Sequence, residues 1–265
     1  MKKFILLLLL STTFSFCQTP KKAETVSVNG KKIYYEVYGE GEGTPLFFLH
    51  GYSLSSKHWQ PYVADFYKDY QVYLIDLTGH GRSDSFKEDL SMKSVAEDLN
   101  ALIVHLKLQK IQAIGFSFGG DVLYQLALLR PELIASMITI GAVGTWTVDD
   151  FPEYQKVFNY ENRANFPWSE SDHGDDEKIK GILEQFKNYR VKLSDTELQS
   201  IKPEVLMILG DDDEGMDFKE VARVKKNLPM SDLWVLPNEA HSAHEGETKP
   251  QFIKVAKAFL SKKNN

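Results

Sequence analysis

The chain alternates between two kinds of apolar segment, and this alternation predicts the fold class. Short continuous apolar runs alternate with longer segments in which apolar residues recur at helical spacing. Continuous runs are typical of strands buried on both faces, and the helical spacing is typical of amphipathic helices. We therefore predict an α/β domain: a mostly parallel central sheet of about eight strands with helices on both faces. The expected strands are 46–49, 72–75, 111–116, 137–140, 205–209 and 233–236, and the expected helices are 91–106, 118–129, 221–228 and 250–260.

A hairpin is expected near the start of the domain. Residues 25–28 and 33–38 flank the dipeptide Asn29-Gly30. Asn-Gly supplies the positive φ angles that a two-residue turn needs between antiparallel strands. We therefore expect two antiparallel strands ahead of the parallel part of the sheet.

The alternation breaks between about residues 145 and 201, and we interpret this segment as a small lid inserted over the sheet. It is rich in aromatic residues, and residues 145–176 contain eight carboxylates against Lys156 and Arg163. Residues 179–191 have the spacing of one amphipathic helix. Aromatic residues above a reaction site would form a mostly apolar pocket. The acidic balance either disfavours anionic substrates or is only a solvated face.

Composition and charge limit the class of protein. The 265 residues suffice for one large domain or two small ones, and 43% hydrophobic with 26% charged residues is ordinary for a globular protein. The net charge of −6 excludes an overall basic surface that would attract nucleic acid.

The first 17 residues have the pattern of a signal peptide, so we expect export to the periplasm or the medium. Lys2 and Lys3 precede a short apolar run at 4–10, too short for a comfortable membrane span. Cleavage before Gln18 would leave a domain of 18–265 without a membrane span. The alternatives are a lipid anchor on Cys17 and an uncleaved anchor. Because Cys17 is the only cysteine, the mature domain would have no disulfide and no cysteine nucleophile or metal ligand.

The segment Gly115-Phe116-Ser117-Phe118-Gly119 carries the strongest chemical signal. It has the form G-x-S-x-G and lies between an expected strand and an expected helix. This context gives the motif its meaning, because a tight strand-to-helix turn holds the serine hydroxyl out at the carboxyl end of the sheet. Ser117 is therefore the candidate nucleophile.

With this motif in place, the chain resembles the α/β-hydrolase superfamily over nearly all of residues 18–265. The matching segments follow successive strands in the family's order: His50-Gly51, residues 76–83, the serine turn, residues 210–213 and Ala240-His241. The resemblance implies a serine hydrolase without a cofactor.

The resemblance also implies partners for Ser117. The family order is serine, acid, histidine, which selects His241 as the base and Asp213 as the acid. A serine hydroxyl needs such a base, and the base needs an orienting group. His244 is a rival that we expect to be a surface residue. Asp211 and Asp212 are rivals for the acid, expected otherwise to serve as turn and capping residues.

Further residues are assigned by the same resemblance. It implies that the backbone N–H groups of Tyr52 and Phe118 bind the oxyanion. The side chains of Tyr52, Trp146 and Trp168 are expected to line the substrate pocket. Asp76, His80 and Arg82 are interpreted as a structural loop tied down by hydrogen bonds and an ion pair. No metal site is expected, because residues 241–245 lack the spacing of H-E-x-x-H or H-x-x-E-H.

The sequence therefore predicts a hydrolase of small or medium carboxylic esters or lactones that acts through an acyl-enzyme on Ser117. Within hydrolases the alternatives are an aminopeptidase, an amidase or a C–C bond hydrolase, because fold does not decide among them. A noncatalytic binding protein that keeps the fold is the alternative of another class. The expected partner is a small molecule, and the sequence does not fix the oligomeric state.

Overall fold

A computed structural model describes residues 19–39 and 44–262 of the chain. The expected signal peptide, including Cys17, lies outside the described residues. Within the described ranges, no helix combines the length and the apolar character that crossing a bilayer requires.

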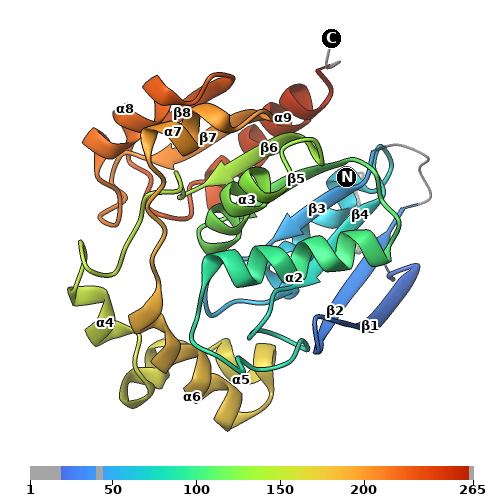
Figure 1. Ribbon diagram of the computed structural model, residues 1–265, viewed down its shortest axis with the longest axis vertical. Coiled ribbons are helices and arrows are strands. Elements are labelled where there is room, and N and C mark those ends of the chain that lie inside the picture. Colours follow the sequence, from blue (N-terminus) through green and yellow to red (C-terminus); the bar gives the residue numbers. More distant parts are fainter. Residues whose placement is uncertain (1–18, 40–43, 263–265) are drawn as a thin grey trace, which may run out of the picture.

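The core of the molecule is one eight-stranded sheet in the order β1-β2-β4-β3-β5-β6-β7-β8 (Figure 1). The first strand pairs antiparallel with the second, the second pairs antiparallel with β4, and all other neighbours are parallel. This confirms the predicted fold class. The strands are β1 (Lys22–Val28), β2 (Lys31–Tyr38), β3 (Leu46–Leu49), β4 (Val72–Asp76), β5 (Ile111–Phe116), β6 (Ile134–Ile140), β7 (Glu204–Gly210) and β8 (Ser231–Leu236).

Helices cover both faces of the sheet. One hydrophobic cluster contains residues of α2 (Met92–His105), α3 (Phe118–Leu129) and α8 (Phe218–Asn227). The opposite cluster contains residues of η1 (Ser56–Tyr62), α1 (Val63–Phe66) and α9 (Lys249–Leu260), which follows the short turn η4 (Gly246–Thr248). Alternate side chains of each strand enter the two clusters: in β3, Phe47 and Leu49 face the first, and Leu46 and Phe48 the second. This explains why β3 is a continuous apolar run.

The hairpin turn is the one that Asn-Gly predicts. Asn29 has φ of 49° and Gly30 has φ of 72°, as a two-residue turn between β1 and β2 requires. The first strand begins three residues earlier than its apolar pattern predicts, because the backbone of Lys22 still pairs with Val37. Backbone pairing at a sheet edge does not need an apolar side chain.

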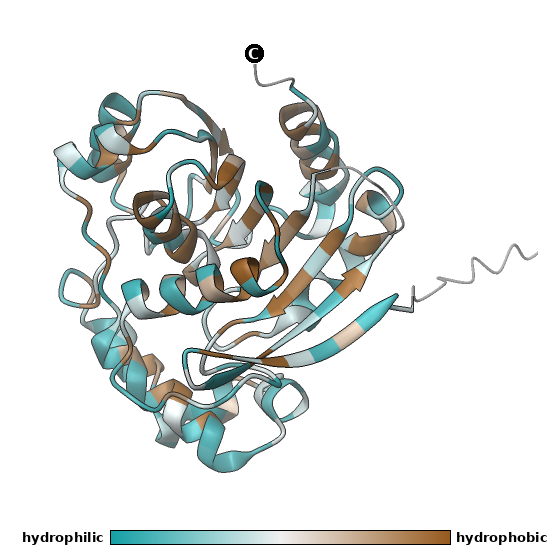
Figure 2. Ribbon diagram, turned by 45° about the vertical axis from the view of Figure 1, so that its right-hand side comes forward, coloured by the Kyte–Doolittle hydropathy of each residue, from teal (hydrophilic) through white to brown (hydrophobic). Residues whose placement is uncertain are grey.

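The segment between β6 and β7 forms a set of short helices, most of which lie apart from the sheet (Figure 1). Figure 2 shows many hydrophilic residues along these helices, in contrast to the largely hydrophobic central strands. We call residues 146–189 the cap. It contains α4 (Glu153–Val157), η2 (Tyr160–Asn165), α5 (Ser169–His173), α6 (Asp176–Gln185) and η3 (Phe186–Asn188).

Two details of this segment differ from the sequence-based expectation. The helix expected at 179–191 starts earlier, at Asp176, because the Asp175 side chain caps it, and it ends at Gln185 before η3. Beyond η3, Arg190 forms an isolated antiparallel β-bridge with Thr147 and so cannot continue the helix. In addition, α7 (Asp195–Ser200) lies beside α8, where Asp195 pairs with Arg223. The predicted insertion of 145–201 therefore divides into the cap and a helix that belongs to the main layer.

Candidate active site

Ser117 lies at a strained turn between β5 and α3. Its backbone has φ of 49° and ψ of −115°, a region that side chains other than glycine rarely occupy. The glycines around it are required by close packing: a Cβ atom on Gly119 would lie 2.4 Å from the carbonyl oxygen of Leu49, and one on Gly115 would lie 2.5 Å from that of Gly119. Strain of this kind persists only where the surrounding structure holds it. Here the Ser117 N–H donates to the Ile140 carbonyl at 2.7 Å.

Asp213 and His241 meet although 28 residues separate them. His241 Nδ1 lies 2.7 Å from Asp213 Oδ2, and the Asp213 carboxylate is buried. The second carboxylate oxygen accepts from the Gly215 N–H at 3.0 Å, so the acid is fixed on both sides. If Nδ1–H donates to Asp213, the remaining nitrogen, Nε2, is free to accept a proton.

The rival acids have other partners. Asp211 Oδ1 accepts from the Asn238 N–H at 2.6 Å, and the Asp212 N–H donates to the Glu239 carbonyl at 3.0 Å. Both contacts join the loop after β7 to the loop after β8. Of the three neighbouring aspartates, the structure therefore places only Asp213 against His241.

Ser117 and His241 line the same cavity, which has a volume of about 670 Å³. Its wall is mostly aromatic and comes from both the sheet and the cap. Tyr52, Trp146 and Trp168, the residues expected to line a substrate pocket, all contribute. Six further aromatic residues complete that part of the wall: Phe116, Tyr154, Phe158, Phe166, Phe186 and Tyr189.

The loop after β3 brings Tyr52 beside the start of α3. His50 fixes this loop, because its Nδ1 lies 2.8 Å from the Gly51 carbonyl while its Nε2 accepts from the Leu77 N–H at 3.0 Å. The Tyr52 ring contacts Phe118 edge to face, with ring centroids 5.4 Å apart. Its hydroxyl donates to the Ile182 carbonyl of the cap at 2.6 Å. The Phe118 N–H is at the N-terminus of α3, where the helix dipole favours an anion.

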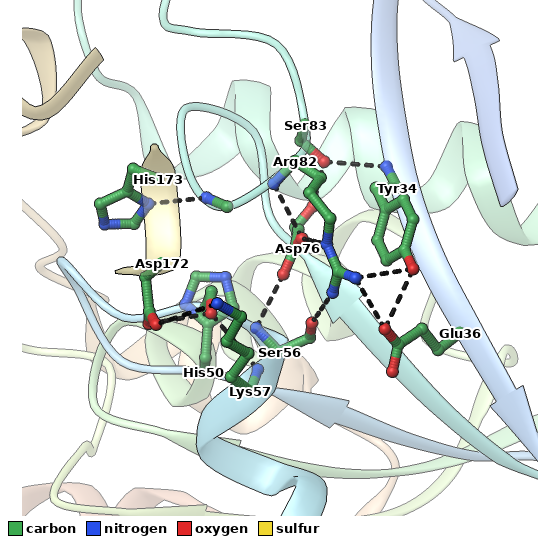
Figure 3. Close-up of polar contacts among 12 residues, drawn as sticks. Tyr34, Glu36, His50, Ser56, Lys57, Asp76, Arg82, Ser83, Asp172 and His173 are labelled. Atoms are coloured by element: carbon green, nitrogen blue, oxygen red, sulfur yellow. Dashed lines mark hydrogen bonds and ion pairs between the residues drawn. The ribbon is translucent and has the colours of Figure 1, made fainter. Parts of the chain in front are cut away.

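Asp76 and Arg82 form the centre of a polar network (Figure 3), in which Asp76 is buried and the Arg82 side chain is 39% exposed. Asp76 accepts from the Ser56 N–H at 2.7 Å and from the Arg82 N–H and Nε at 2.8 and 3.0 Å. Burial alone would raise the pKa of Asp76, but the Arg82 charge, His50 and the hydrogen bonds from backbone N–H groups together outweigh burial and hold that pKa below its usual range. Arg82 also pairs with Glu36 at 2.8 Å. His80 is fully buried and packs against Tyr52 and Phe118. These positions agree with a structural loop.

The cap is attached to the loop after β3 by polar contacts from α5 and the residue before it. Trp168 Nε1 donates to the Ser53 carbonyl at 2.8 Å, and the Ser55 hydroxyl donates to Asp172 at 2.8 Å. His173 uses both ring nitrogens. Nδ1 accepts from the Gly81 N–H at 2.9 Å (Figure 3), and Nε2 lies 3.1 Å from the Ser53 carbonyl. This arrangement requires neutral His173, and burial lowers its pKa to about 4.

His244 is not the surface residue that its position near the last helix suggested. It is fully buried among aromatic rings, and its Nε2 lies 3.0 Å from Nε2 of His58. Burial lowers the pKa of His244 well below the usual value, so it is a poor general base. The sequence expectation was wrong because the apolar pocket that holds His244 comes from η1 and α9, far apart in the chain.

His58, His244 and Glu245 also have donor atoms within 4.8 Å of one another, the spacing of a possible metal site. However, the two histidine Nε2 atoms are at hydrogen-bond distance, and Glu245 faces the other nitrogen of His58, Nδ1, at 3.5 Å. One ion cannot use these facing atoms together without displacing the hydrogen bond. The arrangement fits a hydrogen-bonded chain of side chains better than a metal centre.

Asp121 is a buried acid of the cavity wall that the sequence reasoning missed. Its carboxyl group accepts from the Gly144 N–H at 3.1 Å and from the Tyr189 hydroxyl at 2.8 Å. Burial raises its pKa to about 7. The available signal was its position: it is the one charged residue in the otherwise apolar or small first two turns of α3, four residues after Ser117.

Comparison with known proteins gives one family. The family model described as "alpha/beta hydrolase fold" matches residues 44–179, about half of the chain. A pimeloyl-[acyl-carrier protein] methyl ester esterase of Yersinia enterocolitica is 31% identical over 120 residues, 45% of this chain and 44% of that protein. A bifunctional esterase/perhydrolase of Acinetobacter calcoaceticus is 32% identical over 117 residues, 43% of this chain and 42% of that protein. The match thus spans less than half the length of these relatives.

Solved structures share the architecture over most of the chain. An α/β-hydrolase enzyme from a Medee basin deep-sea metagenome library superposes with a TM-score of 0.77 and 20% identity, covering 91% of this chain and 99% of that chain. The carboxylesterase CesB of Bacillus subtilis superposes with a TM-score of 0.74 and 20% identity, covering 91% of each chain. At this identity the likeness concerns the fold alone.

Proposed function

Because the chain belongs to the α/β-hydrolase fold family, we propose that it is a serine hydrolase that cleaves carboxylic esters or lactones through an acyl-enzyme on Ser117. The observation that carries the proposal is the hydrogen bond of 2.7 Å between His241 and the buried Asp213, with His241 and Ser117 in the wall of one cavity. The esterases among the relatives favour ester substrates for this site. The mostly apolar cavity wall suits an uncharged acyl chain.

In the proposed reaction, His241 Nε2 removes the Ser117 proton as the hydroxyl oxygen attacks the carbonyl carbon. Asp213 holds the imidazole by Nδ1 and stabilises the imidazolium. The same proton then passes from His241 to the leaving alcohol, and a water molecule activated by His241 hydrolyses the acyl-enzyme. The backbone N–H groups of Tyr52 and Phe118 are the proposed donors to the oxyanion. Loss of one such donor typically lowers kcat by about 100- to 1000-fold.

Active-site labelling tests the proposal directly. A fluorophosphonate probe should label the wild-type protein and leave the Ser117→Ala variant unlabelled. Failure of the probe to label wild type would favour a noncatalytic binding protein. Hydrolysis of a panel of esters, lactones, amides and C–C substrates then identifies the bond that is cleaved.

The acid of the site can be tested in the same assays. Asp213→Asn should lower kcat by about 1000-fold or more, since the histidine loses its orienting partner. Asp212→Asn is the control, and its kcat should stay near that of wild type.

A further inference from the structure

The cavity wall is rich in aromatic residues, but it also contains the carboxyl group of Asp121. Asp121 is on α3 one turn beyond Ser117, and its N–H donates to the Ser117 carbonyl at 3.0 Å. Only 2% of its surface is exposed, although it forms part of the cavity wall. By contrast, Trp168 on the same wall is 37% exposed, and the Lys57 side chain is 43% exposed. The Asp121 carboxyl group therefore belongs to a shielded part of the wall, next to the candidate nucleophile.

The contacts of Asp121 leave room for one more hydrogen-bond donor. Oδ1 accepts from the Gly144 N–H, and Oδ2 accepts from the Tyr189 hydroxyl. A carboxylate can accept about four hydrogen bonds. Among the described residues, no lysine or arginine forms an ion pair with it. Burying a carboxylate without a charged partner is unfavourable. The protein supplies Asp121 with only two hydrogen bonds, so a donor on a bound molecule would stabilise its carboxylate further.

The position of Asp121 beside Ser117 indicates which part of the substrate it meets. In the proposed function, the alcohol leaves after the first step, while the acyl group stays attached to Ser117, one turn of α3 from Asp121. We propose that Asp121 is a specificity-determining residue that accepts a hydrogen bond from a hydroxyl or amino group on the acyl chain of the substrate. This inference rests on the proposed function and narrows its substrate class to esters of hydroxy or amino acids.

A purely structural role must be separated from this one. Tyr189 is the last residue of the cap, and Gly144 lies two residues before the cap begins, so Asp121 also ties the base of the cap to α3. Loss of that tie would change the hydrolysis of every ester. Loss of a specificity contact would change only the ratio between esters with and without a donor.

The test compares matched p-nitrophenyl esters. Esters of 2- and 3-hydroxybutyric acid and of the corresponding amino acids are paired with esters of 2- and 3-methylbutyric acid, in which a methyl group replaces the donor. For wild type at pH 8, above the Asp121 pKa of about 7, we expect kcat/KM to favour at least one donor-bearing ester over its methyl partner by roughly 10- to 100-fold, as a hydrogen bond to a charged group would give. Asp121→Leu should abolish this preference and still hydrolyse the methyl ester. Tyr154→Phe, the matched control, removes a hydroxyl elsewhere on the same wall. It should keep the preference, because Gly144 and Tyr189 still hold Asp121.

Two results would overturn the proposal: equal rates for all pairs in wild type, or an unchanged preference in Asp121→Leu. If the leucine variant does not fold, Asp121→Asn serves instead, because replacing the charged acceptor by an uncharged amide should lower the preference by about fivefold or more relative to wild type. Fluorophosphonate labelling of Ser117 is measured in parallel. A labelled protein without preference contradicts only the role of Asp121, whereas an unlabelled protein contradicts the acyl-enzyme itself.

Discussion

At the scale of single residues, the site depends on places where side chains are excluded. Ser117 can adopt its strained backbone because glycines surround it, and the His241 ring can lie against Gly141, where a Cβ would come within 2.8 Å of Cε1. The hydroxyl and the imidazole therefore reach one cavity only because neighbouring positions have no side chain.

Gly119→Ala tests this dependence. The added Cβ would lie 2.4 Å from the carbonyl oxygen of Leu49, and backbone cannot move aside as a flexible side chain can. We expect the free energy of unfolding to fall by about 3 kcal/mol, measured by denaturant titration. Gly181→Ala is the control, because its Cβ meets nothing within 4 Å, and alanine in a helix interior should add up to about 1 kcal/mol. Equal effects at both positions would refute the packing argument.

At the scale of elements, the cap is a set of short helices attached to the sheet by α5. Helices of five residues have little stability of their own, so α5 depends on its contacts with the rest of the molecule. His173 supplies two of these contacts, to Gly81 and to Ser53, and both lie in loops at the carboxyl ends of strands. Together with the Trp168 and Asp172 contacts, this buried, neutral histidine therefore holds α5 in place.

His173→Ala should loosen the cap. Removing both contacts should speed hydrogen exchange of amides in residues 166–174 by roughly tenfold or more, measured by mass spectrometry. Glu170→Ala is the control, because Glu170 lies on the exposed side of the same helix. Unchanged exchange in His173→Ala would show that aromatic packing alone holds α5.

At the scale of the whole molecule, buried ionisable groups connect stability to pH. Burial lowers the pKa of five histidines, to about 4 for His58 and His173. Asp121 acts in the opposite direction, because its pKa is raised to about 7. The histidines are His50, His58, His80, His173 and His244.

We therefore expect the protein to lose stability as pH falls from about 6.5 to 5. In this window the unfolded chain binds protons at histidines that stay neutral in the folded state, so the free energy of unfolding decreases on acidification. Asp121 has the opposite effect, because it holds a proton in the folded state and releases it on unfolding, which reduces the net proton uptake by about one. Denaturant titrations across this range should show a net uptake of protons on unfolding. A flat profile would contradict the burial of these histidines, and His58→Gln should reduce the slope.

The sequence by itself determined the strands of the central sheet, the long helices of the main layer and their order. The apolar runs, the Asn29-Gly30 turn and the glycines around Ser117 are local signals, because periodicity and backbone strain act within a few residues. They located β5 and α3 with the bounds observed. The family order of motifs also singled out Asp213 and His241, which the structure places 2.7 Å apart.

Only the tertiary structure decided which distant side chains meet. The His58–His244 contact joins residues 186 positions apart, and the Asp121–Tyr189 contact joins residues 68 apart. Such pairs depend on the paths of the loops over the sheet. They also depend on which polar groups are buried, because a buried polar group needs a hydrogen-bond partner in the protein. The pattern of apolar and polar residues indicates the face of a helix or strand on which a residue lies. The partner of that residue and its pKa depend on packing against segments that are distant in the sequence.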